Sequence, residues 1–89
     1  MNAADKKQLK ARAHALKPVI IVGQSGLSET VRAEIELALD HHELIKIKIR
    51  SSDREMRDQI SREICAATGA EPIQRIGQVI VIYRKNTSR

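Results

Sequence analysis

Three short runs of β-branched residues constrain the fold more than any other feature of this 89-residue chain. Two of them, Val19–Val22 and Val79–Tyr83, are apolar without interruption, which predicts strands that are apolar on both faces and central in a sheet. In the third run, isoleucines alternate with basic residues: Ile45, Lys46, Ile47, Lys48, Ile49 and Arg50. This alternation predicts a strand with one apolar face and one basic face.

Helical patterns separate these strands. The spacing of apolar residues predicts helices over about residues 5–16 and 28–42, and a third that begins at a capping box at Ser52 and ends at Gly69. The chain closes with strands over about 72–76 and 78–84, joined at Gly77 in a tight hairpin. We therefore predict an α/β fold with the order αβαβαββ and a four-stranded mixed sheet. Because the chain is short, residues 1–89 are expected to form a single domain, with its core over about 6–85.

The composition excludes several classes of protein. The chain has no Phe, no Trp and one Tyr, which argues against a single-strand binder that stacks bases on a row of aromatic rings. Its one cysteine, Cys65, allows neither an internal disulfide nor a zinc framework. No apolar run approaches the length of a membrane span, and no secretory signal is visible at the N-terminus. We expect a cytoplasmic protein without a membrane partner.

The net charge of +5 is distributed unevenly. Residues 1–26 carry five bases and one acid, whereas residues 27–45 carry one base and five acids. The first helix places basic side chains along one side, and further bases follow the last strand; the set is Lys7, Lys10, His14, Lys17, Arg84 and Lys85. A solvated helix face is the alternative reading for the lysines. A polyanion with closely spaced phosphates would contact several of these groups at once.

A glycine loop lies between the first strand and the second helix, and Lys17 leads into that strand. The loop consists of Gly23, Gln24, Ser25 and Gly26. Glycines at such a junction let a sugar-phosphate backbone approach main-chain N–H groups. The same glycines also suit a tight turn that needs them for geometry alone. The spacing matches neither a phosphate-binding P-loop nor a dinucleotide fingerprint.

No catalytic or metal-binding constellation stands out. Adjacent histidines, His41 and His42, would point about 100° apart on a helix and so could not readily share a metal. Cys65 has no nearby partner in the sequence to activate it as a nucleophile, and the carboxylates of the second helix lack a basic partner at a recognisable spacing. We expect no enzymatic activity, no metal, no cofactor and no small-molecule substrate.

Taken together, four segments resemble one family. They are "LKPVIIVGQSGLSETV", "AEIELALDHHELIKIKI", the "DRE" that begins the third helix, and "RIGQVIVIYR". In this order they resemble the CRM domain (chloroplast RNA splicing and ribosome maturation), specifically the stand-alone bacterial YhbY-like proteins. The resemblance covers roughly residues 6–85. It implies a fold similar to the C-terminal domain of translation initiation factor 3.

The resemblance also implies a function. It implies that the protein binds structured ribosomal RNA during assembly of the large ribosomal subunit, through the GxxG loop and the neighbouring basic surface. Family members often carry a basic residue inside the loop, whereas Gln24 and Ser25 are neutral here. Strand residues Lys46 and Lys48 are further RNA-binding candidates, and with Arg50 they would equally suit an acidic protein partner. A protein-interaction adaptor is therefore the alternative function, and the oligomeric state is left open.

Overall fold

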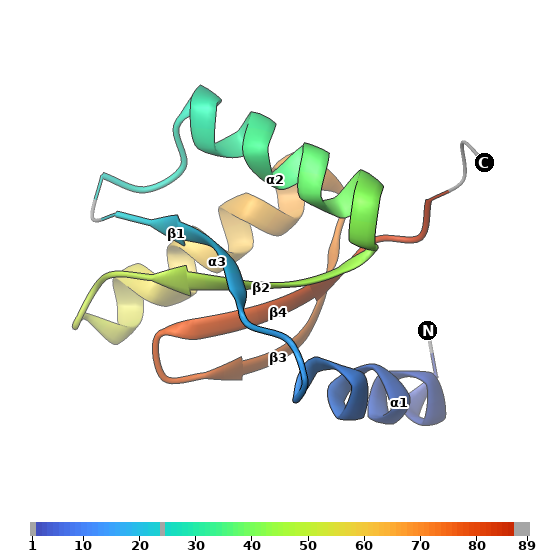
Figure 1. Cartoon of the computed structure of the whole chain (residues 1–89). Helices are drawn as coiled ribbons and strands as arrows, with labels where there is room; N and C mark the ends of the chain where they lie inside the picture. Colours follow the sequence, from blue (N-terminus) through green and yellow to red (C-terminus); the bar gives the residue numbers. More distant parts are fainter. Residues whose placement is uncertain (1, 24, 87–89) are drawn as a thin grey trace.

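The computed structural model describes residues 2–23 and 25–86. Along the chain, its helices and strands follow the predicted αβαβαββ order (Figure 1). Their bounds are α1 Ala3–Ala13, β1 Pro18–Val22, α2 Glu29–His42, β2 Leu44–Ile49, α3 Arg54–Thr68, β3 Glu71–Ile76 and β4 Val79–Tyr83. The fold class predicted from the sequence is confirmed.

The strands form one mixed sheet in the order β1-β2-β4-β3. β1 and β2 are parallel, whereas β4 is antiparallel to both of its neighbours. The prediction that β1 is central is wrong, because β1 forms one edge of the sheet. Its apolar residues instead reach solvent on one face, where Val19 and Ile21 are each more than half exposed.

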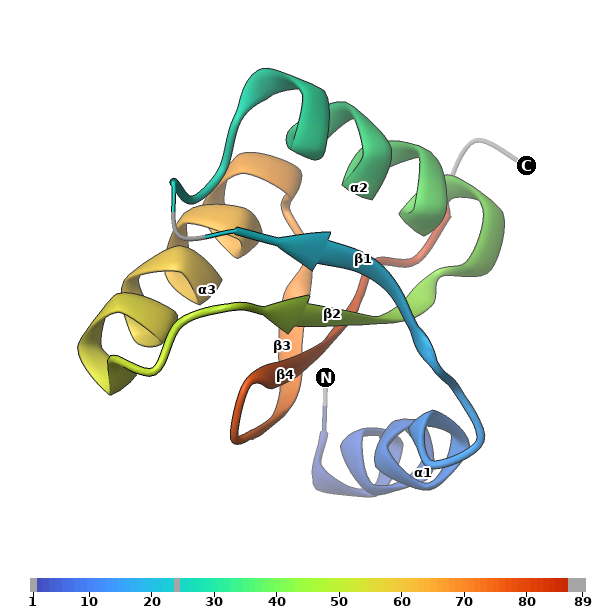
Figure 2. The same cartoon turned by 60° about the vertical axis from the view of Figure 1, so that its left-hand side comes forward.

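The helices cover the two faces of the sheet unequally. α2 and α3 lie on one face and α1 alone lies on the other (Figure 2). On the first face, Ile47 and Ile49 pack with Ile35 and Leu39 of α2 and are fully buried. On the second face, Leu9 and Ala13 of α1 form a smaller cluster with residues of three strands: Leu44, Ile73 and Val81. We call these the closed face and the α1 face.

Local hydrogen bonds explain where the elements begin and end. The third helix is capped one residue later than predicted, because the Asp53 carboxylate, rather than Ser52, accepts the Glu55 N–H at 3.0 Å. Upstream, the Ser51 hydroxyl accepts the Asp53 N–H at 3.2 Å. At the hairpin, Gly77 has φ of 55° and the flanking Ile76 and Val79 pair, as a two-residue turn requires. Within the described residues, no helix is long and apolar enough to cross a bilayer.

Candidate nucleic-acid interface

The α1 face of the sheet is only partly covered by its helix. α1 covers the rows that contain Leu44 and Val81, whereas the following row, toward the C-terminal ends of β1 and β2, is open. In that open row, Ile21 lies beside Lys48, Lys48 beside Val79, and Val79 beside Ile76. Ile21 and Ile76 are 53% and 59% exposed. The open row therefore crosses all four strands, with one lysine among apolar side chains.

The basic residues of β2 belong to this same face. Lys46 is half-buried beside α1, and its Nζ donates a hydrogen bond to the Leu16 carbonyl at 3.1 Å. Lys48 is half-buried with no such partner among the described residues, and Arg50 is exposed just beyond the strand. The alternation predicted from the sequence thus aligns Lys46 and Lys48 along one face, with Arg50 just beyond the strand, and Lys46 is the one held by the fold.

The basic side of α1 is exposed but lies far from the glycine loop. Lys7, Lys10, His14 and Lys17 are all exposed. Lys17 precedes β1, whereas the loop follows it, so the two lie at opposite ends of this strand (Figure 1). Six residue steps along a strand correspond to about 20 Å. The basic helix and the glycine loop, which the sequence suggests are neighbours, are therefore separated in the fold, and the open row lies between them.

The glycine loop is closed by a hydrogen bond of its own. The Gly26 N–H donates to the Gly23 carbonyl at 3.0 Å, and Gly26 has φ of 80°, which favours glycine. Gly23 has no such requirement, and a Cβ built on it would meet nothing within 4 Å. Ser25 is exposed, and Gln24 lies outside the described residues. The positive φ thus explains the glycine at position 26. At position 23, the lack of a side chain leaves the main chain accessible to a ligand.

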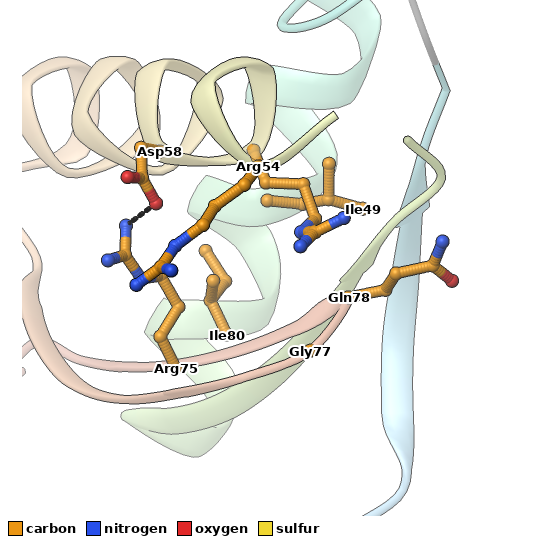
Figure 3. Close-up of a pocket in the computed structure, with 8 residues that line it drawn as sticks. Ile49, Arg54, Asp58, Arg75, Gly77, Gln78 and Ile80 are labelled. Atoms are coloured by element: carbon orange, nitrogen blue, oxygen red, sulfur yellow. Dashed lines mark ion pairs between the residues drawn. The ribbon is translucent and has the colours of Figure 1, made fainter. Parts of the chain in front are cut away.

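Three further arginines come together in a way that the sequence did not predict. Arg54, Arg57 and Arg75 line one hollow between α3 and the β3–β4 hairpin (Figure 3). Arg54 and Arg57 are three residues apart on α3, a spacing that places them on the same side of a helix. Segment 52–69 has more acids than bases, and this net negative charge concealed the pair. Arg75 reaches the hollow from a strand far along the chain, which no local pattern indicates.

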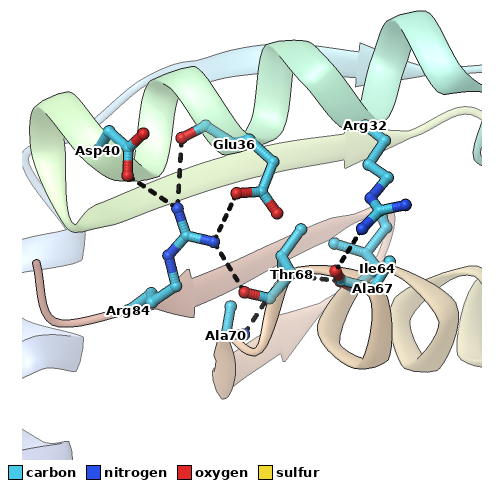
Figure 4. A network of polar contacts seen from close by, with 8 residues as sticks. All are labelled: Arg32, Glu36, Asp40, Ile64, Ala67, Thr68, Ala70 and Arg84. Atoms are coloured by element: carbon cyan, nitrogen blue, oxygen red, sulfur yellow. Dashed lines mark hydrogen bonds and ion pairs between the residues drawn. The ribbon is translucent and has the colours of Figure 1, made fainter.

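Arg84 has a different environment from the other candidates. Its guanidinium donates to the Glu36 carboxylate at 2.8 Å, to Asp40 at 3.0 Å and to the Thr68 carbonyl at 2.7 Å (Figure 4). Hydrogen bonding to Glu36 is the main cause that raises the pKa of Arg84 above its ordinary value. Because these acceptors occupy the guanidinium, we assign Arg84 to joining β4 with α2 and α3. Its neighbour Lys85 is exposed at the same end of the sheet as Lys17.

The groups considered for catalysis are not brought together. Partial burial raises the pKa of the Cys65 thiol, which disfavours the nucleophilic thiolate. The ring centroids of His41 and His42 are 6.2 Å apart, and both residues are exposed. Among the described residues, no group of three or more His, Cys, Asp or Glu side chains is placed to hold a metal ion.

Comparison with known proteins agrees with this architecture. The chain is 47% identical over 86 residues to a Pseudomonas aeruginosa protein named "Probable RNA-binding protein PA4753", covering 97% of this chain and 83% of the relative. It is 46% identical over 84 residues to a Haemophilus influenzae protein named "RNA-binding protein", covering 94% and 85% of the two chains. The solution structure of the Staphylococcus aureus protein SAV1595 superimposes with a TM-score of 0.84 at 29% identity, over 96% of this chain and 88% of that one.

The similarity to these relatives extends over 94–97% of this chain. The family model of the CRS1/YhbY (CRM) domain matches residues 1–84, which include the glycine loop, the basic first helix and all four strands. The resemblance seen in the sequence is thereby confirmed: the chain belongs to the CRS1/YhbY (CRM) domain family.

Proposed function

We propose that this protein binds structured RNA, without catalysing a reaction, along a basic track on the α1 face. The observation that carries the proposal is the open row, in which Lys48 lies uncovered between the basic helix and the glycine loop. The relatives are named RNA-binding proteins, which supports RNA as the ligand. The track comprises Lys7, Lys10, His14, Lys17, Lys46, Lys48, Arg50, Lys85, Gly23, Ser25 and Gly26.

The dimensions of the track suit a phosphate backbone. The roughly 20 Å between Lys17 and Gly23 is a length over which a duplex presents on the order of ten phosphate charges. Recognition rests on phosphate and shape rather than stacking, because the one tyrosine, Tyr83, packs against the cluster under α1. With about five basic side chains in contact with phosphates, a plot of the logarithm of affinity against the logarithm of salt concentration has a slope of about −4 to −5.

Reversal of charge on α1 tests the track. The Lys10→Glu, Lys17→Glu double variant is expected to abolish binding to a ribosomal RNA fragment, because both residues are exposed and their replacement removes attraction and adds repulsion. The matched control, Lys10→Arg with Lys17→Arg, keeps both charges and is expected to keep the affinity. Circular dichroism checks that both variants fold. Undiminished affinity of the glutamate variant, or a flat salt response, contradicts the proposal.

The finer proposal is that the RNA is ribosomal RNA, bound in the cytoplasm while the large subunit is assembled. The family resemblance supports it, since it implies a role in ribosome maturation. Crosslinking in cells, followed by sequencing of the attached RNA, is the direct test. Reads concentrated on precursor RNA of the large subunit are expected, and reads dispersed over other RNAs contradict the assignment.

A protein-interaction adaptor is the second candidate. The observation that favours it is the exposure of apolar side chains beside the basic ones, at Val19, Ile21 and Ile76. An acidic partner with an apolar strip would complement such a face. Co-purification after nuclease treatment separates the two functions: a partner retained without RNA favours the adaptor, and loss of all partners favours RNA binding.

A further inference from the structure

A groove runs between α3 and the β3–β4 hairpin, apart from the α1 face. It consists of two adjoining cavities of about 270 and 510 Å³, which share Asp58, Arg75 and Ile80 in their linings. Small-molecule sites in proteins have volumes of about 300–1,000 Å³. The two cavities differ in chemistry, so the groove has a basic end and an apolar end.

Three guanidinium groups and one carboxylate line the basic end (Figure 3). Arg75 forms an ion pair with Asp58, and Arg57 donates to the Ser51 carbonyl at 2.8 Å. The Arg54 guanidinium is exposed and makes no hydrogen bond or ion pair with the described residues. Because each guanidinium has five N–H donors, Arg57 also retains donors for a ligand. This end therefore has the surplus positive charge and the free donors that a phosphate group requires.

The apolar end is lined by aliphatic side chains and by one hydroxyl. The aliphatic side chains are those of Pro72, Ile80 and Ile82; Ile73, whose side chain packs in the cluster under α1, borders the same cavity. Ser61 lines the same cavity with only 7% of its surface exposed, and its Oγ has no hydrogen-bond partner among residues 2–23 and 25–86. A buried hydroxyl without a partner is unfavourable unless a ligand supplies one. This end therefore suits a flat, largely apolar group with a polar edge.

We propose that the groove holds one unstacked nucleotide, with its phosphate at Arg54 and Arg57 and the edge of its base at the Ser61 hydroxyl. The inference rests on the proposed RNA binding, since the nucleotide belongs to the bound RNA. The base lies against aliphatic side chains and the guanidinium planes of Arg62 and Arg75, which also line the cavity. Arginine planes are an established surface for unstacked bases where aromatic rings are lacking.

The test compares two RNA hairpins that differ by one bulged nucleotide. The wild-type protein is expected to bind the bulged hairpin about ten-fold more tightly than the fully paired one, which corresponds to about 1.4 kcal/mol. Arg54→Ala and Ser61→Ala are each expected to bring this ratio close to one. Equal affinity of the wild type for both hairpins, or a ratio that survives both substitutions, overturns the inference.

Two matched controls separate the groove from general effects. Lys10→Ala removes one exposed charge of the track on α1 and is expected to weaken binding of both hairpins equally, which leaves the ratio unchanged. Ser52→Ala removes an exposed hydroxyl and is expected to change neither affinity. Because the Ser61 hydroxyl has no hydrogen-bond partner in the described part of the chain, Ser61→Ala is expected to fold with undiminished stability.

Titration with single nucleotides distinguishes failure of the groove from failure of the proposed function. Nucleoside 5′-monophosphates are expected to shift the amide resonances of Ser61, Cys65 and Arg75, whereas inorganic phosphate is expected to shift only those near Arg54 and Arg57. If neither hairpin binds but the nucleotides produce these shifts, RNA binding fails and the groove is a site for free nucleotides. If both hairpins bind and the nucleotides produce no shift, the groove is not the site.

Discussion

The two faces of the sheet have the same strands but opposite exposure. On the closed face, Ile45, Ile47 and Ile49 are at most 1% exposed beneath α2 and α3. On the α1 face, one helix covers part of the surface, and Ile21 and Ile76 are more than half exposed. The closed face therefore holds the larger of the two buried clusters, and the part of the α1 face beyond α1 is left available for binding. In this protein, exposed apolar residues of the strands therefore mark the part of the sheet that no helix covers.

Truncation of matched isoleucines on the two faces gives the largest expected difference. Ile47→Ala leaves a cavity in a fully buried site and is expected to lower the free energy of unfolding by about 2–5 kcal/mol. Ile21→Ala removes a side chain that is 53% exposed and is expected to cost less than about 1 kcal/mol. Urea denaturation measures both. Similar losses would show that something covers the α1 face in solution.

Loss of the Arg84 network is expected to be the next largest effect. Arg84→Ala leaves the Glu36 carboxylate and the Thr68 carbonyl without this donor, and we expect a loss of about 2 kcal/mol. Arg75→Ala is the control, since its more exposed pair with Asp58 is worth at most about 1 kcal/mol. Thermal unfolding followed by circular dichroism compares the stabilities of the two variants. A larger loss from Arg75→Ala would contradict the structural role of Arg84.

Substitution of the two loop glycines is expected to separate a requirement for positive φ from a role in RNA binding. Gly26→Ala places a side chain at φ of 80° and is expected to cost about 1 kcal/mol of stability. Gly23→Ala meets no atom within 4 Å and is expected to change stability by less than about 0.5 kcal/mol. If RNA approaches the main chain here, Gly23→Ala nevertheless weakens RNA binding in a filter-binding assay. An unchanged affinity would remove Gly23 from the track.

Lys48 is expected to affect stability least and to report on binding most directly. Lys48→Ala should leave the melting temperature nearly unchanged, because its charge has no partner among the described residues. The salt dependence of RNA affinity should become shallower by about one unit of slope. Lys46→Ala is the comparison, since it also removes the hydrogen bond to the Leu16 carbonyl and so is expected to lower stability. An unchanged slope for Lys48→Ala would place the RNA elsewhere.

The sequence alone determined the elements, their order and the alternation of β2. These depend on residues close together in the chain: the isoleucines two residues apart in β2, the apolar residues that lie along one side of α2, and Gly77 in the hairpin. The family resemblance rests on the same local segments and is confirmed. The sequence placed the cap of α3 one residue early, because both Ser52 and Asp53 are good caps and a hydrogen bond to Ser51 decides between them.

Only the tertiary structure decided which charged groups are free. Lys48 lies on the central strand β2 and Arg84 directly follows the central strand β4, yet acids of α2 hold Arg84 and no described residue holds Lys48. Arg75 pairs with Asp58, and Ser61 lines the groove with no hydrogen-bond partner that the structure describes, because α3 packs beside a hairpin that follows it in the chain. Such contacts join residues that no periodicity relates. Strand order has the same origin: β1 has a sequence suited to a central strand, and it lies at the edge because β4 inserts on the other side of β2.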